Sequence, residues 1–205
     1  MSALLVAPPL APLQRPIGLT EPRPKRLTTE EFYGLADAGL FQNQIVVLLD
    51  GRIYEMPVPN PPHVMSVLLT EGVMRSAFSA GYVIRTQQPL PIGQYTDPIP
   101  DVAIVQGSPR DFVKHPRNAQ LVIEVADTSL AMDLGEKALL YAADGIADYW
   151  VVDINARQLH VFRDPLNDAV TGEARYATRT VIDAAGNVTP LAAPGTSIAV
   201  ADFLP

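Results

Sequence analysis

The chain contains no cysteine among its 205 residues, which excludes disulfide bonds and thiolate metal sites. A bound metal ion would therefore need oxygen or imidazole ligands. Long apolar segments are also missing. Residues 1–13 are apolar but interrupted by prolines and lack a basic leading segment, so they do not match a secretory signal. No run reaches the length of a membrane span, and we expect a cytoplasmic protein with no membrane partner.

Positive charge is scarce: 15 lysines and arginines stand against 22 acids, a formal net charge of −7. Because nucleic-acid binding depends on basic side chains that displace counterions, this balance disfavours tight nucleic-acid binding. It does not exclude an enzyme whose acids hold cations. The basic residues gather in two groups, which are either solvated surface or a rim that contacts phosphates. They are Arg23, Lys25 and Arg26, and further on Arg110, Lys114, His115 and Arg117.

The composition otherwise indicates one globular domain, since hydrophobic residues make up 48% and charged residues 18% of the chain. Residues 1–26 are rich in proline and show no periodicity. We interpret them as an N-terminal arm. Residues 27–205 are expected to form a single domain.

Local patterns predict a mixed sheet flanked by helices, an α/β (α+β) fold. Thr28 and Glu31 form a capping box for a helix to about residue 39, and Asp50-Gly51 predicts a hairpin turn. Asp133 is expected to cap a helix that ends near residue 143. The other helix is expected at 63–80, and strands at 45–49, 52–56, 82–88, 101–105, 120–126, 149–154, 158–163, 176–182 and 196–200.

Two of these short apolar strands carry an acid, Asp101 and Glu124. If the strands pair, both carboxylates can project from neighbouring positions at the edge of the sheet. Ionised carboxylates in apolar surroundings are costly unless a cation compensates them. Mg²⁺ prefers such oxygen ligands and completes its shell with water and phosphate. Lys137 on the next helix could face both acids and stabilise charge on a phosphodiester transition state.

Each residue also has a plainer interpretation. Asp101 follows Ile99-Pro100, where Asp is a common turn residue. Glu124 could be an edge-strand acid that faces solvent. Lys137 could be a solvated helix residue paired with Asp133, four residues earlier. His63 could simply begin a helix.

Several segments together resemble the Uma-type family of restriction endonucleases, within the PD-(D/E)xK nuclease superfamily. The matching segments are 27–32, 50–56, 63, 100–105, 121–125, 133–137, 141, 145, 190–191 and 194–198, together with Asp148-Tyr149-Trp150-Val151-Val152-Asp153. The similarity covers roughly residues 27–203.

The resemblance implies a restriction-endonuclease-like core and metal-dependent hydrolysis of phosphodiesters. Asp101 and Glu124 match the family's metal-binding acids. The superfamily lysine would stand two residues after Glu124, where this chain has Ala126, and Lys137 matches the alternative in which the lysine has moved to the following helix. Glu55 and His63 match recurrent family positions, and we expect them to support the site from beside it.

We therefore expect a nuclease that uses Mg²⁺ or Mn²⁺, with DNA as the expected nucleic-acid partner, working as a homodimer. The alternative is a catalytically weak or inactive nuclease-fold protein that acts in binding or assembly. A weaker alternative is a structural protein. Tyr149 and Trp150 are assigned to the core in every case. A positive groove leading to the acids would favour the nuclease.

Overall fold

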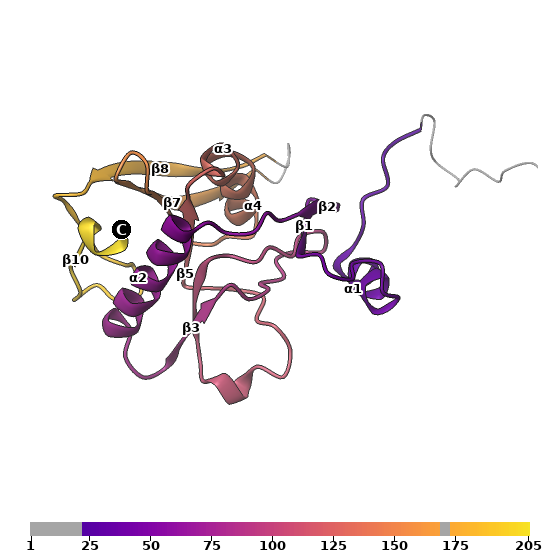
Figure 1. The fold of residues 1–205 in the computed structure, drawn as a ribbon, viewed down its shortest axis with the longest axis horizontal. Coiled ribbons are helices and arrows are strands. Elements are labelled where there is room, and N and C mark those ends of the chain that lie inside the picture. The colour runs from indigo at the N-terminus through magenta and orange to yellow at the C-terminus, as the bar shows by residue number, and fades with distance from the viewer. Residues whose placement is uncertain (1–21, 169–172) are drawn as a thin grey trace, which may run out of the picture.

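The computed structural model describes residues 22–168 and 173–205. The expected N-terminal arm, residues 1–26, lies almost entirely outside the described residues. The sequence from residue 27 onward forms the helices and the sheet described below. Figure 1 shows α1 and the first hairpin at one end of the molecule and the C-terminus at the other.

A six-stranded mixed sheet organises the fold, in the order β3-β4-β5-β6-β7-β8. All neighbouring pairs are antiparallel except β5 and β6, which run parallel. The predicted mixed sheet with flanking helices is therefore confirmed. The strands are β3 (Tyr82–Thr86), β4 (Val102–Gln106), β5 (Leu121–Ala126), β6 (Asp148–Asp153), β7 (Gln158–Asn167) and β8 (Ala174–Asp183).

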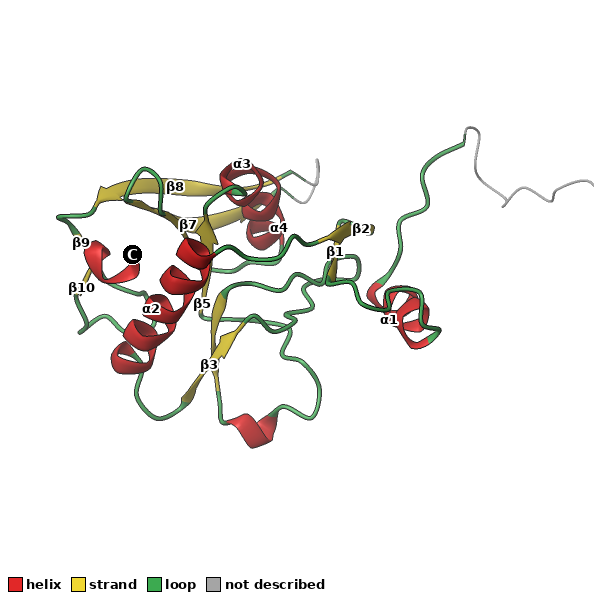
Figure 2. Ribbon diagram, in the orientation of Figure 1, coloured by secondary structure: helices red, strands yellow, loops and turns green. Residues whose placement is uncertain are grey.

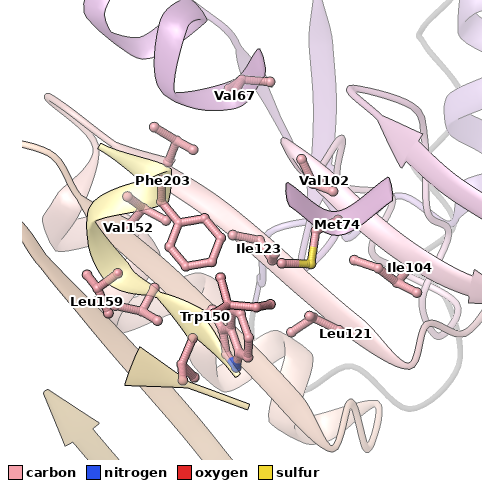
Figure 3. Packing of buried hydrophobic residues seen from close by; sticks show 14 of the residues in the cluster. Val67, Met74, Val102, Ile104, Leu121, Ile123, Trp150, Val152, Leu159 and Phe203 are labelled. Atoms are coloured by element: carbon pink, nitrogen blue, oxygen red, sulfur yellow. The ribbon is translucent and has the colours of Figure 1, made fainter. Parts of the chain in front are cut away.

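Helices cover both faces of this sheet (Figure 2). α2 (Pro61–Ala77) packs on β3, β4 and β5, and α4 (Ala138–Ala143) packs on β7 and β8. Each face has its own apolar core because side chains alternate along the strands. Figure 3 shows the core under α2, where Met74 and Phe203 lie near Trp150. Tyr149 belongs to the opposite core, so the assignment of both aromatics to the interior is confirmed.

The first part of the chain forms smaller elements. α1 (Thr29–Asp37) begins with the predicted capping box. β1 (Val46–Leu49) and β2 (Arg52–Glu55) form the predicted hairpin, whose turn residues Asp50 and Gly51 adopt φ of 48° and 77°. α2 begins at Pro61, two residues earlier than expected, because Asn60 accepts a hydrogen bond from the His63 backbone N–H.

The end of the chain adds two short strands, β9 (Asn187–Val188) and β10 (Ile198–Ala199), which pair with each other. None of the helices in the described ranges is long and apolar enough to cross a membrane.

One helix start was predicted wrongly. Asp133 does not cap a helix; the helical segment begins earlier, with α3 (Leu130–Met132), and Asp133 opens a π-helical turn (Asp133–Lys137) that continues into α4. The Asp133 side chain is buried and accepts a hydrogen bond from the Ser129 hydroxyl. A residue predicted to cap a helix is therefore an interior acid.

Candidate active site

The pairing of β4 with β5 brings the two predicted acids together. Val102 lies opposite Ile123 in this antiparallel pair, so Asp101, just before β4, lies beside the β5 backbone at Glu124 and Val125. Asp101 Oδ2 accepts a hydrogen bond of 2.8 Å from the Val125 N–H. Asp101 is 8% and Glu124 2% exposed. β5 lies inside the sheet, so Glu124 is not an edge-strand acid that faces solvent.

Both oxygens of Glu124 have partners. The Tyr141 hydroxyl of α4 donates to Oε1 at 2.8 Å, and Lys137 Nζ lies 3.0 Å from Oε2. Burial, which the Lys137 charge only partly opposes, raises the pKa of Glu124 to about 7. Without a further cation, this carboxyl group is partly protonated at neutral pH.

Lys137 lies between two acids. Its Nζ is 3.0 Å from Glu124 Oε2 and 2.8 Å from Asp133 Oδ1, and its side chain is only 8% exposed. The solvated interpretation of Lys137 is therefore wrong, while its pairing with Asp133 is confirmed. Burial alone would lower the pKa of Lys137, but the two carboxylates outweigh burial and raise it. Lys137 is therefore an ammonium ion at neutral pH.

The backbone near Lys137 is unusual. The wide π-helical turn begins at Asp133 and ends at Lys137, and such turns are frequent at functional sites. From this turn Lys137 reaches Glu124 of β5 and pairs with Asp133. The Tyr149 hydroxyl donates to the Asp133 carbonyl at 2.8 Å, so β6 also supports the turn.

His63 contacts the other acid. Its Nε2 lies 3.1 Å from Asp101 Oδ1, which also accepts a hydrogen bond of 3.3 Å from Gln87 Nε2. The hydrogen bond to Asp101 raises the pKa of His63, although burial opposes it. Thus the structure places His63 beside a predicted metal ligand. Glu55 is instead exposed at the end of β2.

A cleft of about 610 Å³ opens beside His63, between the end of β2, the start of α2 and the loop that follows β5. Glu55 and Asp127 line it, and no lysine or arginine is among the described residues that do so. The positive groove expected for a nuclease does not lie here. Tyr54 at the same cleft donates a hydrogen bond of 3.2 Å to Glu136.

The donor set fits a hard divalent cation. Asp101 and Glu124 supply carboxylate oxygens in a buried setting, where Lys137 is already shared with Asp133. No cluster of three or more histidine, aspartate or glutamate side chains suited to a metal is found among the described residues. Mg²⁺ does not need such a cluster, because it binds through one or two carboxylates and keeps several waters.

Sequence reasoning missed three participants. Asp133 was considered only as a cap or surface partner, and Tyr141 and Gln87 were not considered as partners of the acids. The four-residue spacing from Asp133 to Lys137 and from Lys137 to Tyr141 was the available signal, since it places all three on one helical face. Nothing local marked Gln87, which reaches Asp101 through the pairing of β3 with β4.

Comparison with known proteins agrees with this architecture. Residues 29–201 match the model of a family described as "Uma2: Putative restriction endonuclease". Among solved structures, the chain is similar to a protein from Anabaena variabilis described as a "putative nuclease belonging to DUF820". The identity is 16%, the match covers 86% of this chain and 97% of that one, and the TM-score is 0.66. No match was found among curated proteins.

Proposed function

The chain belongs to the Uma2 family of restriction endonucleases, and from this premise we propose that it is a metal-dependent nuclease that hydrolyses phosphodiester bonds, with DNA as its substrate. The observation that carries the proposal is the burial of Asp101, Glu124 and Lys137 together at β5: Asp101 accepts a hydrogen bond from the Val125 N–H, and Lys137 pairs with the Glu124 carboxylate. An apolar sheet gains little stability from this cluster, because buried ion pairs are at best a weak source of stability. A functional role explains it.

In this proposal Asp101 and Glu124 hold Mg²⁺ or Mn²⁺. When bound, the ion polarises a phosphoryl oxygen and lowers the pKa of a water molecule. Tyr141 fixes the orientation of Glu124 through its hydrogen bond to Oε1. His63 and Gln87 hold the Asp101 carboxylate from the other side. Glu55, in contrast, has no proposed contact with the reacting groups and contributes to the mouth of the cleft.

Lys137 supplies the fixed positive charge. Its ammonium group lies 2.8 Å from Asp133, which keeps it in place, and 3.0 Å from Glu124, a proposed metal ligand. A preorganised charge of this kind stabilises the negative charge that grows on the phosphoryl oxygens and the leaving group. We also propose a homodimer, since a two-fold arrangement is the simplest way to cut both strands of a duplex.

The test is cleavage of supercoiled plasmid and of single-stranded DNA with Mg²⁺ or Mn²⁺, and with EDTA. We expect metal-dependent nicking that Glu124→Gln and Lys137→Ala each reduce about a hundredfold or more. Asp37→Asn is the control, because Asp37 is exposed at the end of α1, away from the site (Figure 1). Cleavage that survives Glu124→Gln and Lys137→Ala would refute the assignment. A monomeric mass in solution would refute the dimer.

A second candidate is a nuclease-fold protein that is weak or inactive and acts in binding or assembly. The cleft beside the acids favours it, because its charged lining residues are Glu55 and Asp127. This candidate predicts a folded protein that cleaves neither the plasmid nor the single-stranded DNA, with Mg²⁺ or with Mn²⁺.

A further inference from the structure

A second pocket, whose lining residues differ from those of the acidic cleft, is basic. It has a volume of about 590 Å³ and opens between α1, β3 and the loop that joins β4 to β5. We call it the Arg85 pocket; its polar lining comprises Arg85, Lys114, His115 and Arg117, with Glu30 and Tyr33 of α1. Positive charge therefore exceeds negative charge here, in a protein whose net charge is −7.

Arg85 is the unusual member. It is only 8% exposed, yet among the described residues no carboxylate forms an ion pair with it. Its Nη2 donates to the Pro89 carbonyl at 3.2 Å and lies 3.1 Å from His115 Nδ1. Its Nε is buried and has no hydrogen-bond partner within the described ranges. Burying a charged guanidinium with an unused donor is costly, so a bound anion would stabilise this side chain.

The loop supplies further charge at the surface. Lys114, His115 and Arg117 are exposed, and Arg117 Nη2 donates to the Gly93 carbonyl at 2.6 Å, which fixes this side chain at the pocket. Arg110 belongs to the same basic group in the sequence, but it is not among the residues that line the pocket. Of the two interpretations of this group, a phosphate-contacting rim suits Lys114 and Arg117, and solvated surface suits Arg110.

The pocket is adjacent to the candidate active site. Arg85 pairs with Ala103 across β3 and β4, and Asp101 precedes Ala103 by two residues, so Arg85 and Asp101 project on the same side of the sheet. Gln87, two residues after Arg85, donates to Asp101. Gln87 follows the end of β3 and adopts φ of 49°, so the chain turns there beside Asp101. A nucleic-acid strand with one phosphate at Asp101 and Glu124 can therefore present a neighbouring phosphate to Arg85.

We propose that the Arg85 pocket binds a phosphate group of a nucleic-acid strand next to the scissile position; this extends the proposed function and rests on it. Arg85 supplies a buried positive charge beneath the pocket, and Lys114 and Arg117 neutralise the phosphate from the rim. The phosphate is either an internal diester or the monoester at a strand end. The pocket also supplies the positive surface that the cleft at the acids lacks.

The test measures binding without cleavage. A short fluorescein-labelled DNA strand is titrated with the full chain in EDTA, and the Kd is read from fluorescence anisotropy at several salt concentrations. We expect Lys114→Gln and Arg85→Gln each to raise the Kd about fivefold or more and to reduce the salt slope by about one. Arg110→Gln is the matched control, since it removes the same charge from the same loop outside the pocket.

Because Arg85 is buried, its variant is used only if its thermal unfolding midpoint matches that of the wild type. Lys114→Gln carries the test otherwise, because Lys114 is exposed. Measuring one strand with a 5′-phosphate and one with a 5′-hydroxyl distinguishes a terminal monoester from an internal diester. If Lys114→Gln weakens binding only of the 5′-phosphorylated strand, the pocket binds the monoester. If it weakens binding of both strands equally, the pocket binds the diester.

Two results overturn the proposal: a wild type that does not bind the strand, and a Lys114→Gln variant that binds no more weakly than Arg110→Gln. If the pocket substitutions are neutral while plasmid cleavage persists, only the pocket fails. If Lys114→Gln weakens binding selectively while neither metal supports cleavage, the pocket stands and the nuclease proposal fails.

Discussion

The buried carboxyl group of Glu124 makes the stability of the metal-free protein depend on pH. Burial, against the opposing charge of Lys137, raises the pKa of Glu124 from its ordinary 4.5 to about 7. An acid with a higher pKa in the folded state binds its proton more tightly there. The contribution of Glu124 to stability is therefore greatest below about pH 4.5, falls as the pH rises toward 7 and then levels off. Across that window the loss amounts to about 3 kcal/mol at 1.36 kcal/mol per pKa unit.

Glu124→Gln removes the titrating group while keeping its size and a carbonyl oxygen that can accept from Lys137. Between about pH 5.5 and about pH 8, wild type loses about 2 kcal/mol of unfolding free energy through this group, and the variant does not. We therefore expect the unfolding free energy of the variant, relative to that of wild type, to be about 2 kcal/mol higher at pH 8 than at pH 5.5. Urea unfolding in EDTA, followed by the fluorescence of Trp150, measures it. Trp150 is the only tryptophan of the chain and is fully buried.

Glu55→Gln provides the control, because it changes an exposed carboxylate at the same cleft. It should show no comparable pH-dependent gain. The reasoning fails if Glu124→Gln differs from wild type by the same free energy at both pH values. It also fails if the variant loses stability relative to wild type as the pH rises.

Three further outcomes are expected. Lys137→Met removes the cation shared by Glu124 and Asp133, so the unfolding free energy should fall by about 3 kcal/mol or more at pH 8, and less at pH 5.5, in urea unfolding. Asp148→Ala should cost about 3–5 kcal/mol, because Asp148 is fully buried and pairs with Arg163 Nε at 2.9 Å; unchanged stability would contradict this. Mg²⁺ should raise the thermal unfolding midpoint of wild type but not of Glu124→Gln, and EDTA should reverse it.

The features that could be predicted from the sequence depend on local order. The short apolar runs of β4 and β5 predicted strands, and their pairing placed Asp101 beside Glu124 as expected. The capping box of Thr28 and Glu31 and the turn at Asp50-Gly51 were also predicted correctly. In each case the deciding interactions lie within a few residues of the pattern, so the sequence carries them directly.

Asp133 shows where such reasoning fails. Aspartate is common at helix N-termini, and the residues that follow it form a good helix, so a cap was the natural prediction. The structure extends the helix three residues upstream and buries Asp133 against Lys137 and Ser129. Only the packing of this segment against β5 and β6 distinguishes the two arrangements, and that packing involves strands on either side of it in the chain.

Arg85 was missed for a related reason. In the sequence it stands between Ile84 and Thr86 on an edge strand, where an arginine normally faces solvent. Its burial comes from the loop that joins β4 to β5, whose His115 lies 3.1 Å away from Arg85. A contact over thirty residues has no periodic signature. The loop's basic residues were visible in the sequence, but the buried arginine that gives them a common target was not.

The charges of the candidate site link its stability to its proposed chemistry. Three carboxylates, Asp101, Glu124 and Asp133, are buried with one ammonium group, Lys137. Lys137 is shared between two of them, and Asp101 has His63 and a backbone N–H as partners. The cluster is therefore deficient in positive charge, and Glu124 responds by holding a proton. A divalent cation bound by Asp101 and Glu124 would replace that proton, so metal binding should release a proton and remove the stability cost of ionising Glu124.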